Sequence, residues 1–266
     1  MKTLPGDPAT SDRQPALETR GLTIRFGGHV AVSDVSAAFH AGTLTAIVGP
    51  NGAGKTTYFN LISGQLRPTS GSVLLAGEDV TRTPPSHRTR HGMGRGFQLT
   101  NLFPGLSVQE NIRLAVQSRR GGRVNLTSMW SRHVALIERA DHCLNEVRLY
   151  DKRHALASSL SHGDQRKLEV GILLALESEV FMFDEPTAGM SVDEVPVVLD
   201  LIQKIKQQKG KTILLVEHKL DVIRSLADRI VVLHNGCKVA DGRPEDVMAS
   251  AIVKEAYLGS KVAAHA

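Results

Sequence analysis

The stretch GPNGAGKTT, residues 49–57, combines glycines, a lysine and two hydroxyl side chains in the spacing G-x-x-x-x-G-K-[ST]. Glycines let a backbone wrap closely around an anion and aim its N–H groups at phosphate oxygens. In this spacing the lysine can reach terminal phosphates, and the following hydroxyl can bind Mg²⁺. The pattern predicts a nucleotide phosphate-binding loop made of Gly49, Pro50, Asn51, Gly52, Ala53, Gly54, Lys55, Thr56 and Thr57.

Two carboxylates, Asp184 and Glu185, follow the apolar run VFMF. Ligands of open parallel sheets bind outside the carboxyl ends of the strands, so acids at this edge can meet bound phosphates. We expect Asp184 to hold Mg²⁺, directly or through water, and Glu185 to polarise an attacking water molecule. The alternative is a strand that simply ends in acids at a loop, and the phosphate-binding loop upstream argues against it.

A histidine and a glutamine complete the candidate site. His218 ends the apolar run LLVEH at the same predicted sheet edge, where we expect it to contact the γ-phosphate, although a lone histidine is more often structural. Gln98, in GRGFQ, precedes a helical stretch, and its amide can bind Mg²⁺ or water. The predicted catalytic residues are therefore Glu185, His218 and Gln98, and the predicted magnesium ligands are Thr56, Gln98 and Asp184.

The hydrophobic pattern predicts the elements that position these residues. Residues 43–49 form a short β-branched run typical of a buried strand, and KTTYFNLISG predicts a helix ending at Gly64. ALETRGLTIRF and AVSDVSAAFH alternate apolar and polar residues and predict strands separated by a glycine turn. Between residues 99 and 160 the apolar spacing becomes helical. Strands then alternate with helices, which predicts a mostly parallel sheet, and RIVVLHNGCKVADG predicts a hairpin turning at Asn-Gly.

Composition restricts the class of protein. The chain has 266 residues, 41% hydrophobic and 22% charged, enough for a packed core. Aromatic residues make up only 4%, which argues against a base-stacking surface, while the net charge of +5 fits nucleic acid, anionic lipid or an anionic small ligand. Cys143 and Cys237 lie in no metal-ligand spacing and suggest a reducing compartment. No apolar run approaches the ~20 residues that cross a bilayer, and the N-terminal residues lack the apolar core of a signal peptide.

The stretch LSHGDQRKLE, residues 160–169, predicts a helix start at which Ser161 can act as the N-cap. Taken in order, the phosphate-binding loop, this stretch, the acid pair and His218 resemble the nucleotide-binding subunit of ATP-binding cassette (ABC) transporters. The resemblance extends from Leu17 to Gly259. In that family Ser161 and Gly163 belong to a signature motif usually written LSGGQ, which here is LSHGD.

The resemblance implies a second anion site at this helix start. In the family, the serine, the glycine N–H and the helix dipole complete the phosphate cradle of a partner subunit, with ATP held between the two chains. Ser161 and Gly163 would act in this way, and Phe26 fits the aromatic residue that stacks on adenine. In the family, the loop after the acid pair normally ends in Asp, and Ser191 stands at that position here. LSHGDQR, DEPTAGM and AYLG are similar to ATPases of the branched-chain and hydrophobic amino-acid uptake group, with urea and amide importers as near relatives.

The fold class implied is α/β, a P-loop NTPase core whose mostly parallel sheet is flanked by helices, with an antiparallel β subdomain and an inserted helical subdomain. The expected division is a disordered leader at 1–16, the β subdomain and P-loop core at 17–98, the helical subdomain at 99–160, the signature helix and the rest of the core at 161–259, and a tail at 260–266. ATP and Mg²⁺ are the implied cofactors.

The implied partners are a second ATP-binding subunit, identical or paralogous, two membrane-spanning permease subunits and, indirectly, a substrate-binding protein. They place the chain at the cytoplasmic face of the inner (plasma) membrane, held there through the permeases. No nucleic-acid partner is expected: cassette ATPases acting on nucleic acid tend to carry two cassettes or a long coiled coil, and the sequence has neither. A switch GTPase would need N-K-x-D, which the sequence also lacks.

Overall fold

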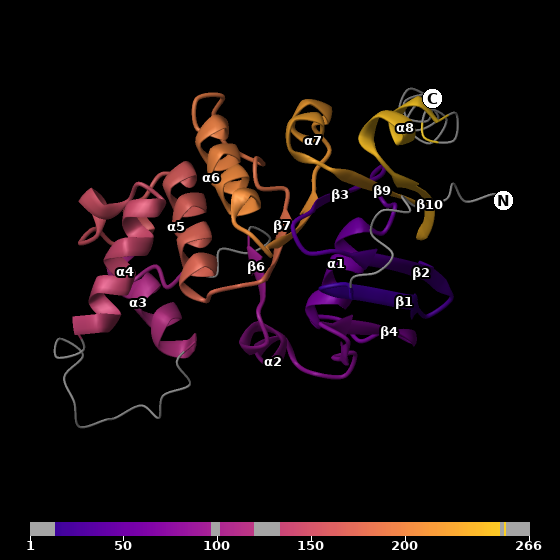
Figure 1. The fold of residues 1–266 in the computed structure, drawn as a ribbon, viewed down its shortest axis with the longest axis horizontal. Coiled ribbons are helices and arrows are strands. Elements are labelled where there is room, and N and C mark those ends of the chain that lie inside the picture. The colour runs from indigo at the N-terminus through magenta and orange to yellow at the C-terminus, as the bar shows by residue number, and fades with distance from the viewer. Residues whose placement is uncertain (1–13, 97–101, 120–133, 251–252, 254–266) are drawn as a thin grey trace.

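The computed structural model describes residues 14–96, 102–119, 134–250 and 253 (Figure 1). The strands are β1 Leu17–Phe26, β2 His29–Phe39, β3 Leu44–Val48, β4 Ser70–Leu75, β5 Glu78–Asp79, β6 Met93–Gly96, β7 Val180–Asp184, β8 Thr212–Val216, β9 Arg229–His234 and β10 Cys237–Gly242. The helices are α1 Lys55–Ser63, α2 Pro85–Arg90, α3 Val108–Arg119, α4 Val134–Glu146, α5 His162–Ala175, α6 Val195–Gln207, α7 Leu220–Leu226 and α8 Pro244–Ala249.

The central sheet has the strand order β10-β9-β3-β8-β7-β6. All its pairs are parallel except β9 with β10, which form the expected hairpin. At the hairpin turn Asn235 and Gly236 have φ values of 47° and 76°, which a two-residue type I′ turn requires. The mostly parallel sheet predicted from the alternation of strands and helices is confirmed.

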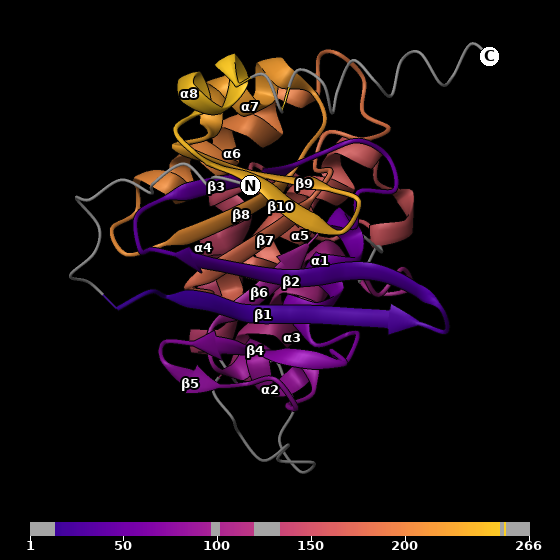
Figure 2. The same cartoon turned by 90° about the vertical axis from the view of Figure 1, so that its right-hand side faces the viewer.

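A second sheet is antiparallel, with the order β2-β1-β4-β5, and lies in front of the central sheet in Figure 2. Strand β2 reaches the hairpin of the central sheet, where the N–H of Ser33 donates to the carbonyl of Gly236 at 2.8 Å. The expected α/β fold with an additional antiparallel sheet is therefore confirmed. The finer division into leader, subdomains and tail stays a prediction, and residues 1–13 and the whole tail lie outside the described residues.

Strand β7 separates two layers of the core. Its even-numbered residues Val180 and Met182 pack in the cluster that contains α1 and the antiparallel sheet. Phe181 and Phe183 point to the other face, into the cluster formed with α3 to α7. Because successive side chains of a strand alternate between faces, α1 and α5 must cover opposite faces of the central sheet. In Figure 1, β6 and β7 accordingly lie between these two helices.

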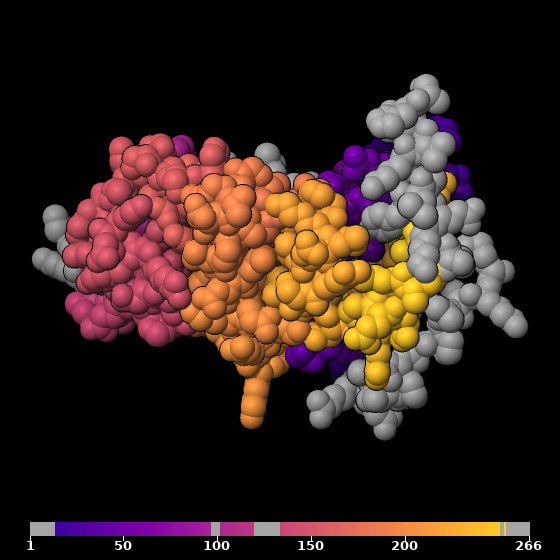
Figure 3. All heavy atoms as spheres, turned by 90° about the horizontal axis from the view of Figure 1, so that it is seen from above, coloured from indigo at the N-terminus to yellow at the C-terminus, as the bar shows by residue number. Residues whose placement is uncertain are grey.

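Helices α3, α4 and α5 pack together at one end of the molecule. Gly171 of α5 allows a close crossing, since a Cβ at this position would lie 2.6 Å from Cδ1 of Ile112 in α3. Figure 3 shows α6 and α7 between the helices of residues 134–175 and the C-terminal α8. The helices predicted between residues 99 and 160 are thus present as α3 and α4, with residues 120–133 outside the described part.

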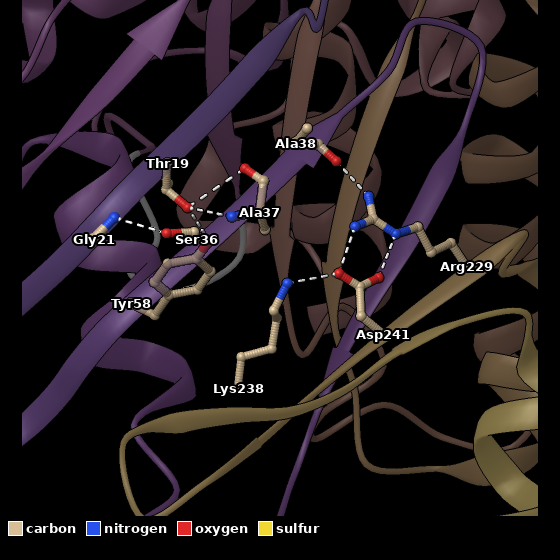
Figure 4. Close-up of polar contacts among 9 residues, drawn as sticks. All are labelled: Thr19, Gly21, Ser36, Ala37, Ala38, Tyr58, Arg229, Lys238 and Asp241. Carbon is tan, nitrogen blue, oxygen red and sulfur yellow. Dashed lines mark hydrogen bonds and ion pairs between the residues drawn. The ribbon is translucent and has the colours of Figure 1, made fainter. Parts of the chain in front are cut away.

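Figure 4 shows two further polar contacts that join the antiparallel sheet to the rest of the core. The hydroxyls of Thr19 in β1 and Tyr58 in α1 are 2.7 Å apart and buried. Arg229 forms a two-pronged ion pair with Asp241, at 2.6 and 2.7 Å, and also donates to the carbonyl of Ala38 in β2. The first contact fixes β1 against helix α1, and the second fixes β2 against β9 of the central sheet.

Candidate nucleotide site

Residues 49–57 form a turn between β3 and α1, in the strand–loop–helix context that the motif requires. Two of its glycines leave no room for a side chain. A Cβ at Gly49 would lie 2.1 Å from the carbonyl oxygen of Leu233, and a Cβ at Gly54 would lie 2.5 Å from that of Ala31. Gly54 also adopts φ 95° as the N-cap of α1. The loop therefore keeps its shape only with glycine at these positions.

Lys55 is folded back onto its own loop. Its ammonium donates to the carbonyl oxygens of Gly49 at 2.7 Å and Pro50 at 2.9 Å. Burial lowers the pKa of Lys55, and the charges of Glu185 and Asp184 oppose this effect. The ammonium thus lies within the electrostatic reach of both predicted acids, and it can exchange its two neutral carbonyl partners for phosphate oxygens.

Asp184 ends β7 with its side chain only 5% exposed. Burial raises the pKa of this carboxyl, while the charge of Arg95 lowers it. Arg95, in β6, places its guanidinium 3.1 Å from Oδ2 of Asp184 and donates to Asn60 and Ser63 of α1, each at 2.7 Å. Arg95 therefore ties the buried acid to the helix that begins at Lys55.

Glu185 has a backbone conformation unusual for a residue other than glycine, with φ 50°. Its N–H donates to the carbonyl of Val216 at 2.9 Å, and its side chain is 44% exposed. Nδ1 of His218 lies 3.8 Å from Oε1 of Glu185. The adjacent strands β7 and β8 thus bring Glu185 and His218 together as expected, and the unfavourable backbone holds the carboxylate toward solvent.

Glu217 stabilises the turn that carries His218. Its side chain is fully buried, and its carboxylate accepts hydrogen bonds from the hydroxyl of Thr187 at 2.5 Å and from the N–H of His218 at 2.7 Å. The N–H of Lys219 also donates to it, at 3.3 Å. Because three donors converge on one charged group, the turn that carries His218 is held against the loop that follows Glu185.

Ser161 is the N-cap of α5, as the sequence predicts, and its hydroxyl accepts from the N–H of Asp164 at 3.2 Å. The carboxylate of Asp164 turns away to Lys152 and Lys167, at 2.5 and 2.7 Å. The hydroxyl of Ser161 and the N–H of Gly163 both lie at the start of α5. This pair lies on α5 and Lys55 on α1, so the two candidate anion sites belong to helices on opposite faces of the central sheet.

The family described as ABC transporter matches residues 32–188. The chain belongs to the ABC transporter family. Among curated ABC relatives, the chain is similar to the high-affinity branched-chain amino acid transport ATP-binding proteins LivG of Escherichia coli and BraF of Pseudomonas aeruginosa. They are 35% and 36% identical to it, and each alignment covers 92% of this chain and 98% of the relative.

Solved ABC structures have the same fold. The ADP form of MJ1267, an ATP-binding cassette of an ABC transporter, matches with a TM-score of 0.79 at 28% identity and covers 93% of this chain and all of that one. A dimeric post-hydrolysis state of the cassette MJ0796 bound to ADP and Pi matches with a TM-score of 0.74 at 25% identity, covering 86% and 98%. The chain is therefore an ABC-type ATPase with a P-loop NTPase core.

The ABC site has oxygen donors of the kind that Mg²⁺ prefers. The carboxylate of Asp184 and the exposed Thr56 lie at the end of β7 and the start of α1, both close to Lys55. These residues fit a magnesium ion, and Asp184 and Thr56 would be the side chains that hold it. Phe26 ends β1 and is 50% exposed, so its ring is available to a base. Gln98 lies outside the described residues, and its predicted roles stay predictions.

Three residues of this ABC site escaped the sequence analysis: Arg95, Glu217 and Glu194. Arg95 lies in MGRG, which lacks the β-branched pattern of a strand. Glu217 directly precedes His218, and only His218 was assigned to the site from the sequence. Glu194 lies at the N-terminal end of α6, and Oε1 of its carboxylate accepts from the hydroxyl of Ser161 at 3.2 Å. A charged residue directly after the apolar run TILLV could have identified Glu217, whereas MGRG offers no comparable signal for Arg95.

Proposed function

We propose that this chain is the ATP-hydrolysing subunit that powers an importer of branched-chain or other amino acids. The observation that carries the proposal is the similarity to LivG and BraF over 92% of this chain and 98% of each relative, which leaves no large part of either protein unmatched. A partial match limited to the phosphate-binding loop would support ATP binding alone.

The phosphate-binding residues act within one chain. Backbone N–H groups of residues 49–57 and the dipole of α1 bind the phosphates, and Lys55 moves from its own loop carbonyls to the terminal phosphate oxygens. Thr56 and Asp184 would hold Mg²⁺, which neutralises phosphate charge when bound. Glu185, whose side chain is 44% exposed and whose N–H is fixed on β8, accepts a proton from the attacking water as the water oxygen bonds to the γ-phosphorus; the bond from that phosphorus to the β–γ bridging oxygen breaks, and ADP leaves with its electron pair. His218 orients the γ-phosphate.

A second chain completes each site. Ser161 and Gly163 start a helix that covers the face of the sheet opposite to α1, so they suit the phosphate of a nucleotide bound to a partner. Two ATP molecules then lie between two such chains. Their γ-phosphates hold the chains together, and hydrolysis removes that link so that the chains separate.

The second ATP-binding subunit is identical or paralogous, and both contact permease subunits in the membrane. Within the described residues no helix combines the length and the apolar character needed to cross a bilayer. Phe103 and Leu156 are 55% and 50% exposed, and the segments that carry them meet just before α3, where Ser107 pairs with Leu156. They offer an apolar surface for two permeases at the cytoplasmic face of the inner membrane. A substrate-binding protein would act through the permeases, and no nucleic acid is involved.

The test is uptake by the reconstituted complex. The chain is combined in proteoliposomes with two permeases, a binding protein and a second ATPase of a branched-chain amino acid importer, and uptake of labelled leucine, a dicarboxylic amino acid and urea is measured on the side where the chain is supplied with ATP. We expect ATP-dependent uptake of an amino acid. Glu185→Gln should keep ATP binding and lower turnover by about 10²–10⁴-fold, the usual contribution of a general base. Urea uptake alone, or normal turnover by Glu185→Gln, would contradict the proposal.

A further inference from the structure

The start of α5 already binds a carboxylate of the same chain. Oε1 of Glu194 accepts from the hydroxyl of Ser161 at 3.2 Å, and Oε2 accepts from the N–H of Ser191 at 3.3 Å. The N–H of Gly163 also donates to this carboxylate. Hydrogen bonds from Ser191, Ser161 and Gly163 hold the pKa of Glu194 below its usual value, so it is an anion at neutral pH.

The contact is close enough to depend on glycine. A Cβ at position 163 would lie 2.4 Å from Oε1 of Glu194, so any other residue would push the carboxylate away. Glu194 contacts the same two groups, the Ser161 hydroxyl and the Gly163 N–H, that are proposed to bind the phosphate of the partner's ATP. One pair of donors at one helix start cannot serve both anions at once.

The carboxylate of Glu194 is bound as an anion at a helix start and not through an ion pair with a cationic side chain. In the ranges described by the structure, no lysine or arginine forms an ion pair with Glu194. The nearby lysines, Lys152 and Lys167, are instead engaged by Asp164. The carboxylate is therefore held by uncharged donors and by the dipole of a 14-residue helix, which are the forces that bind phosphate at such a position.

We propose that Glu194 is an internal substitute for the partner nucleotide's phosphate, which occupies the second anion site of the separated chain and must leave before two chains close on ATP. This inference rests on the proposed function of Ser161 and Gly163. Glu194 then controls the ATP concentration at which chains associate, without contacting the nucleotide of its own chain. It also keeps the serine and glycine donors arranged for an anion in the absence of a partner.

The size of the effect follows from the fraction of chains in which the site is free. If Glu194 occupies the site in about 90% of separated chains, the site is free in about one chain in ten. Two chains must both free their sites, so the association constant is about 100-fold lower than without this carboxylate, and because two ATP molecules bind, this corresponds to about tenfold in ATP concentration. Removing Glu194 should therefore lower the ATP concentration at half-maximal dimer by about tenfold, while ATP affinity of the single chain stays constant.

The experiment uses Glu185→Gln as background, because this change prevents loss of the γ-phosphate. Dimer formation is followed by analytical ultracentrifugation against ATP concentration, with Glu194→Ala added. The matched control is Asp193→Ala, which removes the same charge from the exposed neighbouring residue. Glu194→Gln, which keeps the side-chain size, serves as a second variant, and ATP binding at low protein concentration verifies that each variant is folded.

We expect a roughly tenfold lower midpoint with Glu194→Ala, a smaller shift in the same direction with Glu194→Gln, and no shift with Asp193→Ala. An unchanged or higher midpoint with Glu194→Ala would overturn the inference and leave the proposed second site standing. An equal shift of the ATP midpoint with Asp193→Ala would also overturn the inference, since general charge repulsion then explains the result. If the Glu185→Gln background forms no dimer at any ATP concentration, the proposed second site fails and the inference fails with it.

Discussion

Arg95→Met tests how the buried acid of the nucleotide site is stabilised in the absence of nucleotide. Arg95 and Asp184 are 9% and 5% exposed and 3.1 Å apart. At an effective dielectric constant of about 20, Coulomb's law gives an attraction of about 5 kcal/mol at this distance. Loss of one partner of a buried pair usually costs about 3–5 kcal/mol, and we expect about 3 kcal/mol because Lys55 also stabilises the negative charge of Asp184.

The loss should depend on pH. Burial already raises the pKa of Asp184, and removal of Arg95 raises it further. A carboxyl whose pKa is raised by folding destabilises the folded chain above its unfolded pKa, by at most about 1.36 kcal/mol per pH unit above ~3.9. The charge-related cost of Arg95→Met is therefore largest near neutral pH, is limited to about 1.5 kcal/mol at pH 5, and disappears below pH 4.

Scanning calorimetry of the nucleotide-free chain in EDTA measures this cost. A loss of about 3 kcal/mol corresponds to a Tm lowered by about 6–9 °C at pH 7.5, with a smaller decrease at pH 5. Asp184→Asn in the Arg95→Met background removes the uncompensated charge and should recover more than half of the decrease. A decrease below about 2 °C, or no recovery in the double variant, would refute the reasoning.

Two further predictions concern the two anion sites. Lys55→Ala should weaken ATP binding to the single chain by about 10–100-fold, because a charge-assisted contact to phosphate contributes about 1.5–3 kcal/mol; isothermal titration calorimetry measures it, and an affinity within twofold of the original excludes Lys55 from the cradle. Ser161→Arg should lower ATP turnover at least tenfold, since a long side chain fills the second site, yet leave ATP affinity of the single chain unchanged. Loss of that affinity would show that Ser161 serves the nucleotide of its own chain.

The sequence predicted those parts of the fold whose residues repeat a pattern. The runs TLTAIV, VFMF and TILLV consist of apolar and β-branched residues, and each forms a buried parallel strand. Strand β6 was missed because Gly94 and Gly96 give it no pattern, although its pairing with β7 needs only backbone groups. The short helices α2 and α8 were missed because six residues contain too few turns for a helical repeat.

The candidate site was predictable where one stretch of chain carries the chemistry, as in residues 49–57. It was not predictable where the chemistry arises from side chains distant in sequence. Arg95 meets Asp184 across 89 residues, and Ser161 meets Glu194 across 33. Such pairs depend on which strands are neighbours and which helix starts face a loop, and hydrophobic spacing determines neither.

The buried contact between Thr19 and Tyr58 has a consequence for how a nucleotide is recognised. Thr19 belongs to the strand that ends at Phe26, the proposed base-stacking residue, and Tyr58 belongs to the helix that begins at Lys55. With Phe26 and Lys55 in their proposed roles, the two ends of a bound ATP would contact parts of the chain that are already joined to each other before the ligand arrives. ATP capture by a single chain would then move the Lys55 side chain but not the strand relative to the helix, so association of two chains would be a separate event that can be regulated independently.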